Sequence, residues 1–507
     1  MEGNKTFVEA DLREALIDAR WPLALDIING PLMAGMAEVG RLFNDNQLIV
    51  AEVLQSAEVM KAAVSFLEPN MDQSEITSRG RILLATVKGD VHDIGKNLVS
   101  IVLGNNGFDI LDLGIRVPNE RLVQAALEYQ PDVIGLSGLL VKSAHQMILT
   151  AEDLRAAGIS APLLVGGAAL TRRFTHRRIA DAYEGFCTYG RDAMSALDLV
   201  DRLTNSEKRG RLETEIEHSV ATDQAHEDVP KKGRLKAKTP VTIASINRNI
   251  IVPSPPDLER HISNLDLDQV WTLLNPQMLF GKHLGLKGSI RQLEQQEDPK
   301  LAMLRNVVHE TQEEVRKGAM TARAVWRFFP AQADGDDLVL LDPDSGEIAA
   351  RWTMPRQTGG SGFCISDYVL DNDHVALFVT TAGHGIRAQV AQLKESGQYL
   401  KSHILASLAV ETAEAAAEWL HQDLRAQWGF ADPGKTSPQD CFSGRYRGKR
   451  FSFGYPACPD LKGQRLLFAA LRPEEIGVEL TEGDMMDPEA SVSAIVFHHP
   501  EARYFSV

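Results

Sequence analysis

Three short stretches carry the residue types best suited to chemistry: 88–95, 137–143 and 166–169. Each contains glycine or serine and follows an apolar run typical of a β-strand. His92 is the only histidine among them, and Asp90 lies two residues before it. A carboxylate on one ring nitrogen fixes the tautomer of a histidine and raises the basicity of the other nitrogen, as it does behind many metal-ligating histidines.

His92 taken alone leaves two interpretations open. A histidine in such a loop is more often a hydrogen-bonded structural residue than a ligand. As a ligand it has no second strong donor nearby, which makes a poor zinc site. A metal bound here would have to arrive already held by another group, and a macrocycle is the natural candidate.

The elements that must position these loops form an alternating pattern from residue 81 onward. Short apolar runs alternate with helical stretches, which predicts a parallel sheet with right-handed crossovers in an α/β flavodoxin-like (Rossmann-like) domain. In the strand order 2-1-3-4-5 the three loops meet at one edge, at the switch point where such sheets bind ligands. The five predicted strands are Ile82–Val87, Phe108–Leu113, Val133–Leu136, Pro162–Val165 and Phe186–Tyr189.

The segments on either side have different patterns. Residues 8–68 repeat apolar side chains at helical spacing, with polar breaks at 29–31 and 44–46, and predict a small helical bundle. Residues 205–239 are charged and poor in apolar side chains, as in a solvated linker. Beyond them we expect an α+β region, with a long helix and strands at Ser402–Gln427, Asp337–Leu341, Val375–Thr380 and Val492–Phe497.

The composition excludes several classes of protein. A net charge of −16 over 507 residues argues against a nucleic-acid or membrane-surface binder. No apolar run approaches the length of about 20 residues needed to cross a bilayer. The chain starts without a secretory-signal pattern, and its four cysteines are scattered with no CxxC pair. We therefore expect a cytoplasmic protein without a cysteine-built zinc site.

The spacing of the three loops resembles a known signature. Asp90-x-His92-x-x-Gly95, then 41 residues, Ser137-x-Leu139, then 26 residues and Gly166-Gly167 is similar to the cobalamin-binding signature of B12-dependent methyltransferases and mutases. The resemblance implies that His92 is the lower axial ligand of cobalt, with Asp90 and Ser143 as a relay behind it. It implies cobalamin contacts, several of them with the displaced nucleotide tail, at Gly95, Ser137, Leu139, Val141, Gly166, Gly167 and Ala168. Val141 departs from the threonine of the best-known methionine synthases.

The flanking segments resemble cobalamin-dependent methionine synthases in particular. The helical segment is similar to their cap, which places Phe43 and Val50 against the methyl-bearing face of cobalamin (methylcobalamin). Arg450-x-x-x-Gly454-Tyr455-Pro456-Ala457-Cys458-Pro459 resembles the S-adenosylmethionine-binding loop of their activation domain. The resemblance implies S-adenosylmethionine contacts at Arg450, Gly454, Tyr455, Ala457, Asp268 and Glu414. The acidic residue that meets the ligand's amino group should be Asp266 or Asp268. The alternative for this motif is a proline-rich surface turn with an incidental arginine.

The resemblance implies an architecture and an activity. We expect a helical cap at 1–76, a cobalamin-binding domain at 77–204, a linker at 205–239 and an activation domain at 240–507. Methylcobalamin would donate its methyl group to homocysteine and be regenerated from methyltetrahydrofolate. Oxidised cob(II)alamin would be rescued by reduction, from a flavodoxin-like or flavoprotein donor, and by methylation from S-adenosylmethionine.

The modules for homocysteine and methyltetrahydrofolate are absent from this sequence, and so is the zinc site expected in the homocysteine module. We expect the C-terminal half of a methionine synthase, produced as a fragment rather than as a naturally split enzyme. The competing hypothesis is a non-catalytic corrinoid carrier or B12 sensor, in which 240–507 is an unrelated module.

Overall fold

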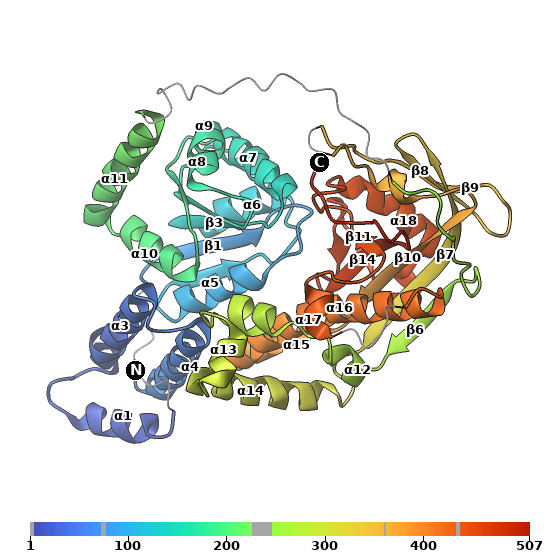
Figure 1. The fold of residues 1–507 in the computed structure, drawn as a ribbon. Helices are drawn as coiled ribbons and strands as arrows, with labels where there is room; N and C mark the ends of the chain where they lie inside the picture. The colour runs from blue at the N-terminus through green and yellow to red at the C-terminus, as the bar shows by residue number, and fades with distance from the viewer. Residues whose placement is uncertain (1–4, 72–77, 226–245, 359–360, 432–436) are drawn as a thin grey trace. The chain divides into compact units, whose positions relative to one another are not determined.

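The computed structural model describes residues 5–71, 78–225, 246–358, 361–431 and 437–507 (Figure 1). By its internal contacts the chain divides into two compact units. The first comprises Met1–Lys232, Phe280–Thr311 and Ala388–Ser407, and the second comprises Gly233–Leu279, Gln312–Arg387 and Leu408–Val507. The predicted domain junctions at 76/77 and 239/240 lie outside the described residues, as does the basic stretch at 231–238.

The N-terminal segment is helical, as predicted. Its helices are α1 (Val8–Ile17), α2 (Ala24–Ile27), η1 (Ile28–Leu32), α3 (Met33–Asn44), α4 (Val50–Leu67) and η2 (Glu68–Asn70). The predicted break at 44–46 is confirmed, because α3 ends at Asn44. The predicted break at 29–31 is wrong, because a π-helical turn carries the chain through Pro31 into α3. Gly30 permits this turn, since a Cβ there would lie 2.7 Å from the Trp21 ring.

A five-stranded parallel sheet follows, in the order β2-β1-β3-β4-β5, and confirms the predicted topology. Its strands are β1 (Arg81–Thr86), β2 (Asp109–Asp112), β3 (Val133–Ser137), β4 (Leu163–Gly166) and β5 (Cys187–Tyr189). The crossover helices are α5 (Ile94–Gly104), α6 (Asn119–Tyr129), α7 (Val141–Ala156), α8 (Arg172–Phe174), η3 (Thr175–Ile179), α9 (Ala180–Ala182) and α10 (Ala193–Thr204).

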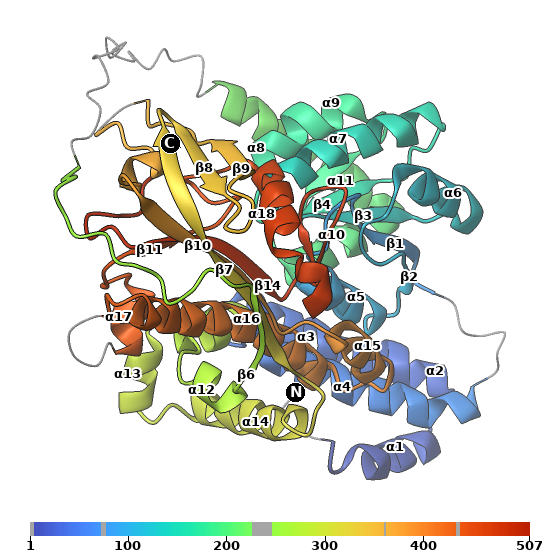
Figure 2. The same cartoon turned by 90° about the vertical axis from the view of Figure 1, so that its right-hand side faces the viewer.

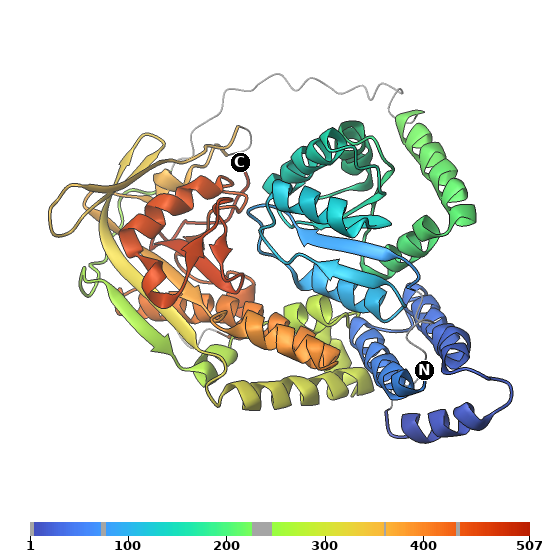
Figure 3. The same cartoon turned by 180° about the vertical axis from the view of Figure 1, so that it is seen from behind.

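Helices cover both faces of this sheet (Figures 1 and 3). Alternate residues of β1 belong to two separate cores. Leu83 and Ala85 are buried with side chains of α6, α7 and α9, whereas Ile82 and Leu84 are buried with side chains of α5 and α10. This period of two is what a strand covered on both faces requires. Both layers of helices leave the carboxyl edge of the sheet to the loops that follow β1, β3 and β4.

The charged segment after 205 differs from the predicted solvated linker. Residues Ser206–Ala225 form helix α11, and Leu212 is buried in the core beside α10. Ion pairs from Arg209 to Glu213, at 2.9 Å, and from Arg202 to Glu215, at 2.5 Å, line its polar side. Charged residues at helical spacing therefore support an exposed helix here.

The second unit contains a mostly antiparallel sheet, in the order β11-β14-β10-β7-β8-β9, with β6 pairing β7. The strands are β6 (His261–Leu265), β7 (Ala322–Asp334), β8 (Asp337–Leu341), β9 (Ile348–Thr353), β10 (Asp373–Thr381), β11 (Lys449–Phe451) and β14 (Ser491–Phe497). A separate ladder joins β12 (Glu479–Leu480) to β13 (Met486–Asp487). The three strands predicted in this region correspond to β8, β10 and β14.

The helices from 267 onward confirm the α+β prediction. They are α12 (Leu267–Trp271), η4 (Gln277–His283), α13 (Ile290–Gln295), α14 (Pro299–Val315), η5 (Ile365–Tyr368), α15 (Ile386–Glu395), α16 (Tyr399–Gln427), α17 (Pro438–Phe442), η6 (Leu461–Gly463), α18 (Gln464–Leu471) and η7 (Pro473–Ile476). The predicted long helix is α16, which begins three residues before the expected start.

Helices cover both faces of the antiparallel sheet (Figure 2). On one face Leu377 of β10 packs in a core with Leu467 and Phe468 of α18. On the other face Thr380 of the same strand donates from Oγ1 to the Ala413 carbonyl of α16, at 3.3 Å. Strands near the centre of the sheet are therefore buried on both sides, which explains their nearly continuous apolar sequence.

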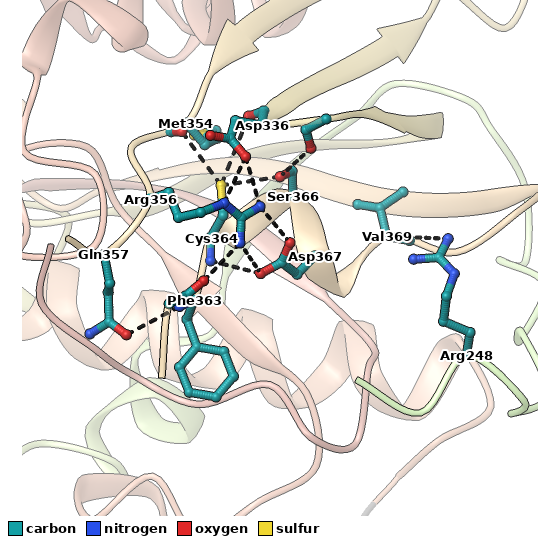
Figure 4. A network of polar contacts seen from close by, with 12 residues as sticks. Arg248, Asp336, Met354, Arg356, Gln357, Phe363, Cys364, Ser366, Asp367 and Val369 are labelled. Carbon is teal, nitrogen blue, oxygen red and sulfur yellow. Dashed lines mark hydrogen bonds and ion pairs between the residues drawn. The ribbon is translucent and has the colours of Figure 1, made fainter. Parts of the chain in front are cut away.

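An arginine network fixes the connection between β9 and β10 (Figure 4). Arg356 donates from Nη1 and Nη2 to the Asp367 carboxylate, at 2.9 and 2.7 Å, and from Nε to Asp336, at 2.8 Å. The neighbouring Gln357 donates from Nε2 to the carbonyl of Ser506, at 2.7 Å. The network thus holds this connection, and the connection in turn holds the C-terminal segment.

Among the described residues, we find no helix with the length and apolar character that crossing a membrane would require.

Candidate functional site

The loop after β1 places His92 immediately before helix α5. Its Nδ1 lies 2.7 Å from Asp90 Oδ1, and its backbone N–H donates to the same oxygen at 3.0 Å. Because Asp90 engages Nδ1, Nε2 is the ring nitrogen suited to ligate a metal. The His92 side chain is 26% exposed and that of Asp90 is 0% exposed, so the pair is reached only from the histidine side.

Asp90 is the centre of the site because its two oxygens serve two different loops. Oδ2 accepts from the Leu139 backbone N–H, at 2.8 Å, and from the Ser143 hydroxyl, at 2.5 Å. Burial opposes ionisation, but the bonds from His92 and Ser143 outweigh it and lower the pKa of Asp90. The structure therefore brings Asp90, His92 and Ser143 together, as predicted, around a buried carboxylate that accepts from four donors.

Glycines let the loops after β3 and β4 approach one another. A Cβ on Gly167 would lie 1.7 Å from the Gly138 carbonyl oxygen, and one on Gly138 would lie 2.6 Å from Ser143 Cβ. Gly167 also has φ of +148°, which favours glycine. Ser137 and Gly166 pair in register at the ends of β3 and β4, so the predicted loops share one edge of the sheet.

The outer side of this edge is open to a ligand. Leu139 is 38% exposed and Val141 is 80% exposed, which is unusual for apolar side chains beside a buried polar group. A Cβ on Gly95 would meet no atom within 4 Å, and Ala168 is also exposed. These surfaces suit a large, partly apolar ligand laid against backbone.

The donor set fits a metal that a macrocycle already holds. Within the described part of the chain no three His, Cys, Asp or Glu side chains are grouped as a metal site. His92 therefore lacks the partners of a zinc site, while a ring that fills the equatorial positions of a metal needs one axial nitrogen. Cobalamin is a group of this kind.

One positioning residue of this site lacked a sequence signal. Lys96 of α5 is only 5% exposed, and its Nζ lies 2.6 and 2.5 Å from the two oxygens of Asp112 at the end of β2. This buried pair fixes the first turn of α5, directly after the His92 loop. A lysine one residue past Gly95 looks like an ordinary helix residue until the fold places β2 beside it.

The two predicted cap residues lie on neighbouring helices. Phe43 near the end of α3 is partly buried against a cluster that includes Val39 and Val53. Val50 is the first residue of α4 and is half-buried. Their contact with a cofactor stays a prediction.

A second constellation lies in the second unit, around Arg450 of β11. Its Nη2 is 3.4 Å from Glu418 Oε2 and 3.7 Å from Glu414 Oε2, both on α16. Burial opposes the charge of Arg450, but the two carboxylates outweigh it and raise the pKa of the guanidinium. Glu414 also raises the pKa of Tyr455, which is 59% exposed. The structure thus brings together three of the predicted residues, Arg450, Glu414 and Tyr455.

The loop after β11 is shaped by its own hydrogen bonds. Gly454 donates to the Cys458 carbonyl, at 2.9 Å, with φ of +89°, and Cys458 donates back to the Tyr455 carbonyl, at 2.9 Å. Ala457 is 4% exposed and belongs to the core. The loop is therefore anchored on one side and presents Tyr455 on the other, which disfavours an incidental surface turn.

Asp268 is placed differently from the other predicted residues. It lies in the first turn of α12, where it forms an ion pair with Arg316. Asp266 caps the same helix and accepts from the Asp268 backbone N–H, at 2.9 Å. The Asp268 carboxylate is thus engaged by a neighbouring guanidinium, and its contact with a ligand stays a prediction.

The sequence comparisons identify the domains in which these residues lie. Residues 80–198 and 1–68 each match a B12 binding domain, and residues 266–507 match the activation domain of vitamin B12 dependent methionine synthase. These matches place the chain in the class of B12-binding proteins and indicate cobalamin as its cofactor.

Two methionine synthases align with the whole length of this chain. Methionine synthase of Mycobacterium tuberculosis (strain ATCC 25618 / H37Rv) is 37% identical over 553 residues, and that of Mycobacterium leprae (strain TN) is 36% identical over 559 residues. Each alignment covers 100% of this chain and 45% of the relative, so the chain spans about half of their length. The chain is homologous to these methionine synthases over its whole length, and the domains that it matches are two B12 binding domains and the activation domain. The hypothesis that 240–507 is an unrelated module is not favoured.

Solved structures with similar parts include the MetH reactivation domain bound to AdoHcy, at 23% identity and a TM-score of 0.49, over 52% of this chain and 86% of that one. The methanol:cobalamin methyltransferase complex MtaBC from Methanosarcina barkeri is 27% identical with a TM-score of 0.36, over 40% of this chain and 75% of that one.

Proposed function

We propose that this chain is the cobalamin-carrying and reactivating part of a methionine synthase. The whole enzyme would transfer a methyl group from methyltetrahydrofolate to homocysteine. The observation that carries the proposal is the buried Asp90 carboxylate, which lies 2.7 Å from Nδ1 of the partly exposed His92 and so makes Nε2 the ring nitrogen suited to a metal.

Bound cobalamin would supply a cobalt ion that carries the methyl group between the two substrates. His92 would hold that cobalt from below through Nε2. Asp90 and Ser143 would hold the proton on the Nδ1 side and thereby set how strongly the imidazole donates. Ser137, Leu139, Val141, Gly95, Gly166, Gly167 and Ala168 would line the slot for the nucleotide tail, and Phe43 and Val50 would cover the opposite face.

The second unit would bind S-adenosylmethionine for reactivation. Arg450 would hold its carboxylate through two parallel N–H donors, Glu414 would meet its ammonium group, and Tyr455 with Gly454 and Ala457 would shape the pocket. Asp268 would have to leave Arg316 to contribute. The electron donor is proposed to be a flavodoxin-like or other flavoprotein. The four free, buried cysteines support a reducing compartment such as the cytoplasm.

The first test concerns His92. The full chain is mixed with hydroxocobalamin and reduced to the Co(II) state, and the nitrogen coupling of the EPR signal is recorded. We expect axial nitrogen coupling in the wild type, its loss in His92→Gly, and its retention in His309→Ala, a control on the exposed side of α14. Unchanged coupling in His92→Gly would refute ligation by His92.

The second test concerns Arg450. Calorimetry with S-adenosylhomocysteine should show binding to the full chain and a loss of at least about tenfold in affinity in Arg450→Met, because a charged, bidentate contact is removed. Equal affinity in the two proteins would refute the assigned role of Arg450.

A further inference from the structure

One stripe of α16 buries polar side chains behind Arg450. Glu414, Glu418, His421 and Arg425 follow one another at steps of four, three and four, and so lie on one side of the helix. Exposure falls along the stripe: the side chain of Glu414 is 42% exposed and that of Glu418 is 9% exposed, while His421 and Arg425 as residues are 0% and 1% exposed. The stripe therefore leads from solvent into the interior of the second unit.

The segment before β11 faces the buried end of this stripe. The ring of Tyr446 lies 4.1 Å from the Arg425 guanidinium carbon and 4.8 Å from Lys449 Nζ, measured to its centroid. The His421 ring packs edge-on against the same tyrosine, with 5.1 Å between centroids. Two cations thus stack on one aromatic ring, which is favourable where water is excluded.

Cations surround the buried end of the stripe. Arg450 and Arg425 act on the carboxylate of Glu418, and both act on His421 together with Lys449. Burial, together with these three cations, lowers the pKa of His421 well below its usual value. The Arg450 guanidinium therefore lies in a largely buried polar surrounding, which suits the carboxylate of a ligand.

The two glutamates both lie near Nη2 of Arg450 but differ in exposure. Glu418 is the closer, at 3.4 Å, and its side chain is only 9% exposed, against 42% for Glu414. Its second oxygen, Oε1, is buried and has no hydrogen-bond partner among the described residues. Glu414, at 3.7 Å, is exposed enough to exchange Arg450 for another cation.

We propose that Glu418 is a positioning residue, which fixes the Arg450 guanidinium for the ligand carboxylate and so releases Glu414 to bind the ligand ammonium group. This inference rests on the proposed binding of S-adenosylmethionine by Arg450. Glu414 and Glu418 are chemically identical and lie one helical turn apart, but the buried Glu418 would support Arg450 and the exposed Glu414 would contact the ligand. Glu418 acts through Arg450 and touches no ligand.

The test uses two ligands with the full chain. S-adenosylhomocysteine has the amino-acid group, whereas 5′-methylthioadenosine has the same adenosine and thioether without it. We expect Glu418→Gln to weaken S-adenosylhomocysteine by about tenfold, the size of one charged hydrogen bond, and to leave methylthioadenosine unchanged. Asp423→Asn is the matched control and should change neither affinity, because Asp423 lies on the same helix but accepts from Gln427, at 2.6 Å.

A double-mutant cycle separates support from contact. In an Arg450→Met background, Glu418→Gln should have no further effect on S-adenosylhomocysteine, while Glu414→Gln should still weaken it. Glu418→Asp keeps the charge but withdraws it by one carbon, and it should reproduce the selective loss if Glu418→Gln does not fold.

Three results would overturn the assignment of Glu418: an unchanged affinity, an equal loss for both ligands, or an additive loss in the Arg450→Met background. Failure of the proposed function is recognised separately, because the wild type would then not bind S-adenosylhomocysteine or Arg450→Met would bind it normally.

Discussion

Replacing Asp90 by Asn tests how the carboxylate supports both the fold and the ligand. Asp90 accepts four hydrogen bonds, two on each oxygen, and is fully buried. An amide has one accepting oxygen, so two donors lose their partner and meet an NH2 group. At about 1.5 kcal/mol for each charge-assisted bond, the variant should lose roughly 3 kcal/mol of local stability.

Hydrogen exchange measures this loss within one domain of a multidomain chain, where a global unfolding curve is not two-state. Central amides of β1 and β3 should exchange about 100-fold faster in Asp90→Asn, which is about 3 kcal/mol. Asp198→Asn, on the exposed side of α10 with its side chain 62% exposed, should change exchange little. Equal protection in Asp90→Asn and wild type would refute the four-bond description.

The same variant should respond differently to acid. The folded-state pKa of Asp90 is lowered, so its contribution to stability is present above the unfolded-state pKa of about 3.9 and is lost as pH falls through the folded value. The stability of Asp90→Asn should therefore fall less steeply with decreasing pH than that of the wild type. With cobalamin added, its His92–cobalt association should weaken by about 10- to 100-fold, as for other second-shell changes behind a metal ligand.

Gly167→Ala should disrupt the domain, because the added Cβ would lie 1.7 Å from a backbone oxygen. The added Cβ of Gly95→Ala would meet no atom within 4 Å, so this variant should unfold like the wild type and lose only cobalamin affinity. Thermal melts and cobalamin titrations distinguish the two variants. The pKa of His421 is lowered in the folded state, so that state binds fewer protons and stability falls as pH drops below about 6.5. His421→Leu should make the fall of Tm between pH 7 and 5 shallower, and an unchanged slope would contradict this. Arg356→Lys keeps a charge but loses the paired bonds to Asp367. Hydrogen-exchange protection of the connection between β9 and β10 should fall by about 2 kcal/mol, and unchanged protection would count against the network.

The parallel sheet was predictable because its signals are local. Each strand is a short apolar run ending in a glycine- or serine-containing loop, and the order 2-1-3-4-5 follows from the connections. The loops after β1, β3 and β4 therefore converged as expected. The π-helical turn at 28–32 was not predictable, since Gly-Pro usually ends a helix and only the packing of Trp21 on Gly30 accounts for the continuation.

The polar interior of the second unit could not be predicted. Glu418, His421 and Arg425 look like ordinary polar residues of an Ala/Glu-rich helix, and only the approach of Tyr446 and Lys449 from a distant segment buries them. The Arg450 motif was recognisable because its residues are adjacent in sequence. The carboxylate that holds Arg450 lies 32 residues away, and no local pattern indicates it.

The division of Asp90 between two loops has a mechanical consequence. Oδ1 holds the histidine, and Oδ2 holds the loop after β3, whose Gly138 is in turn in close contact with Gly167 after β4. A rigid carboxylate of this kind transmits a displacement of either loop to the other. Binding of the nucleotide tail at the edge beside these glycines and bonding of His92 to cobalt should therefore favour one another reciprocally. We expect a corrinoid without its nucleotide tail to form a weaker bond to His92 than intact cobalamin, even though the tail never touches the imidazole.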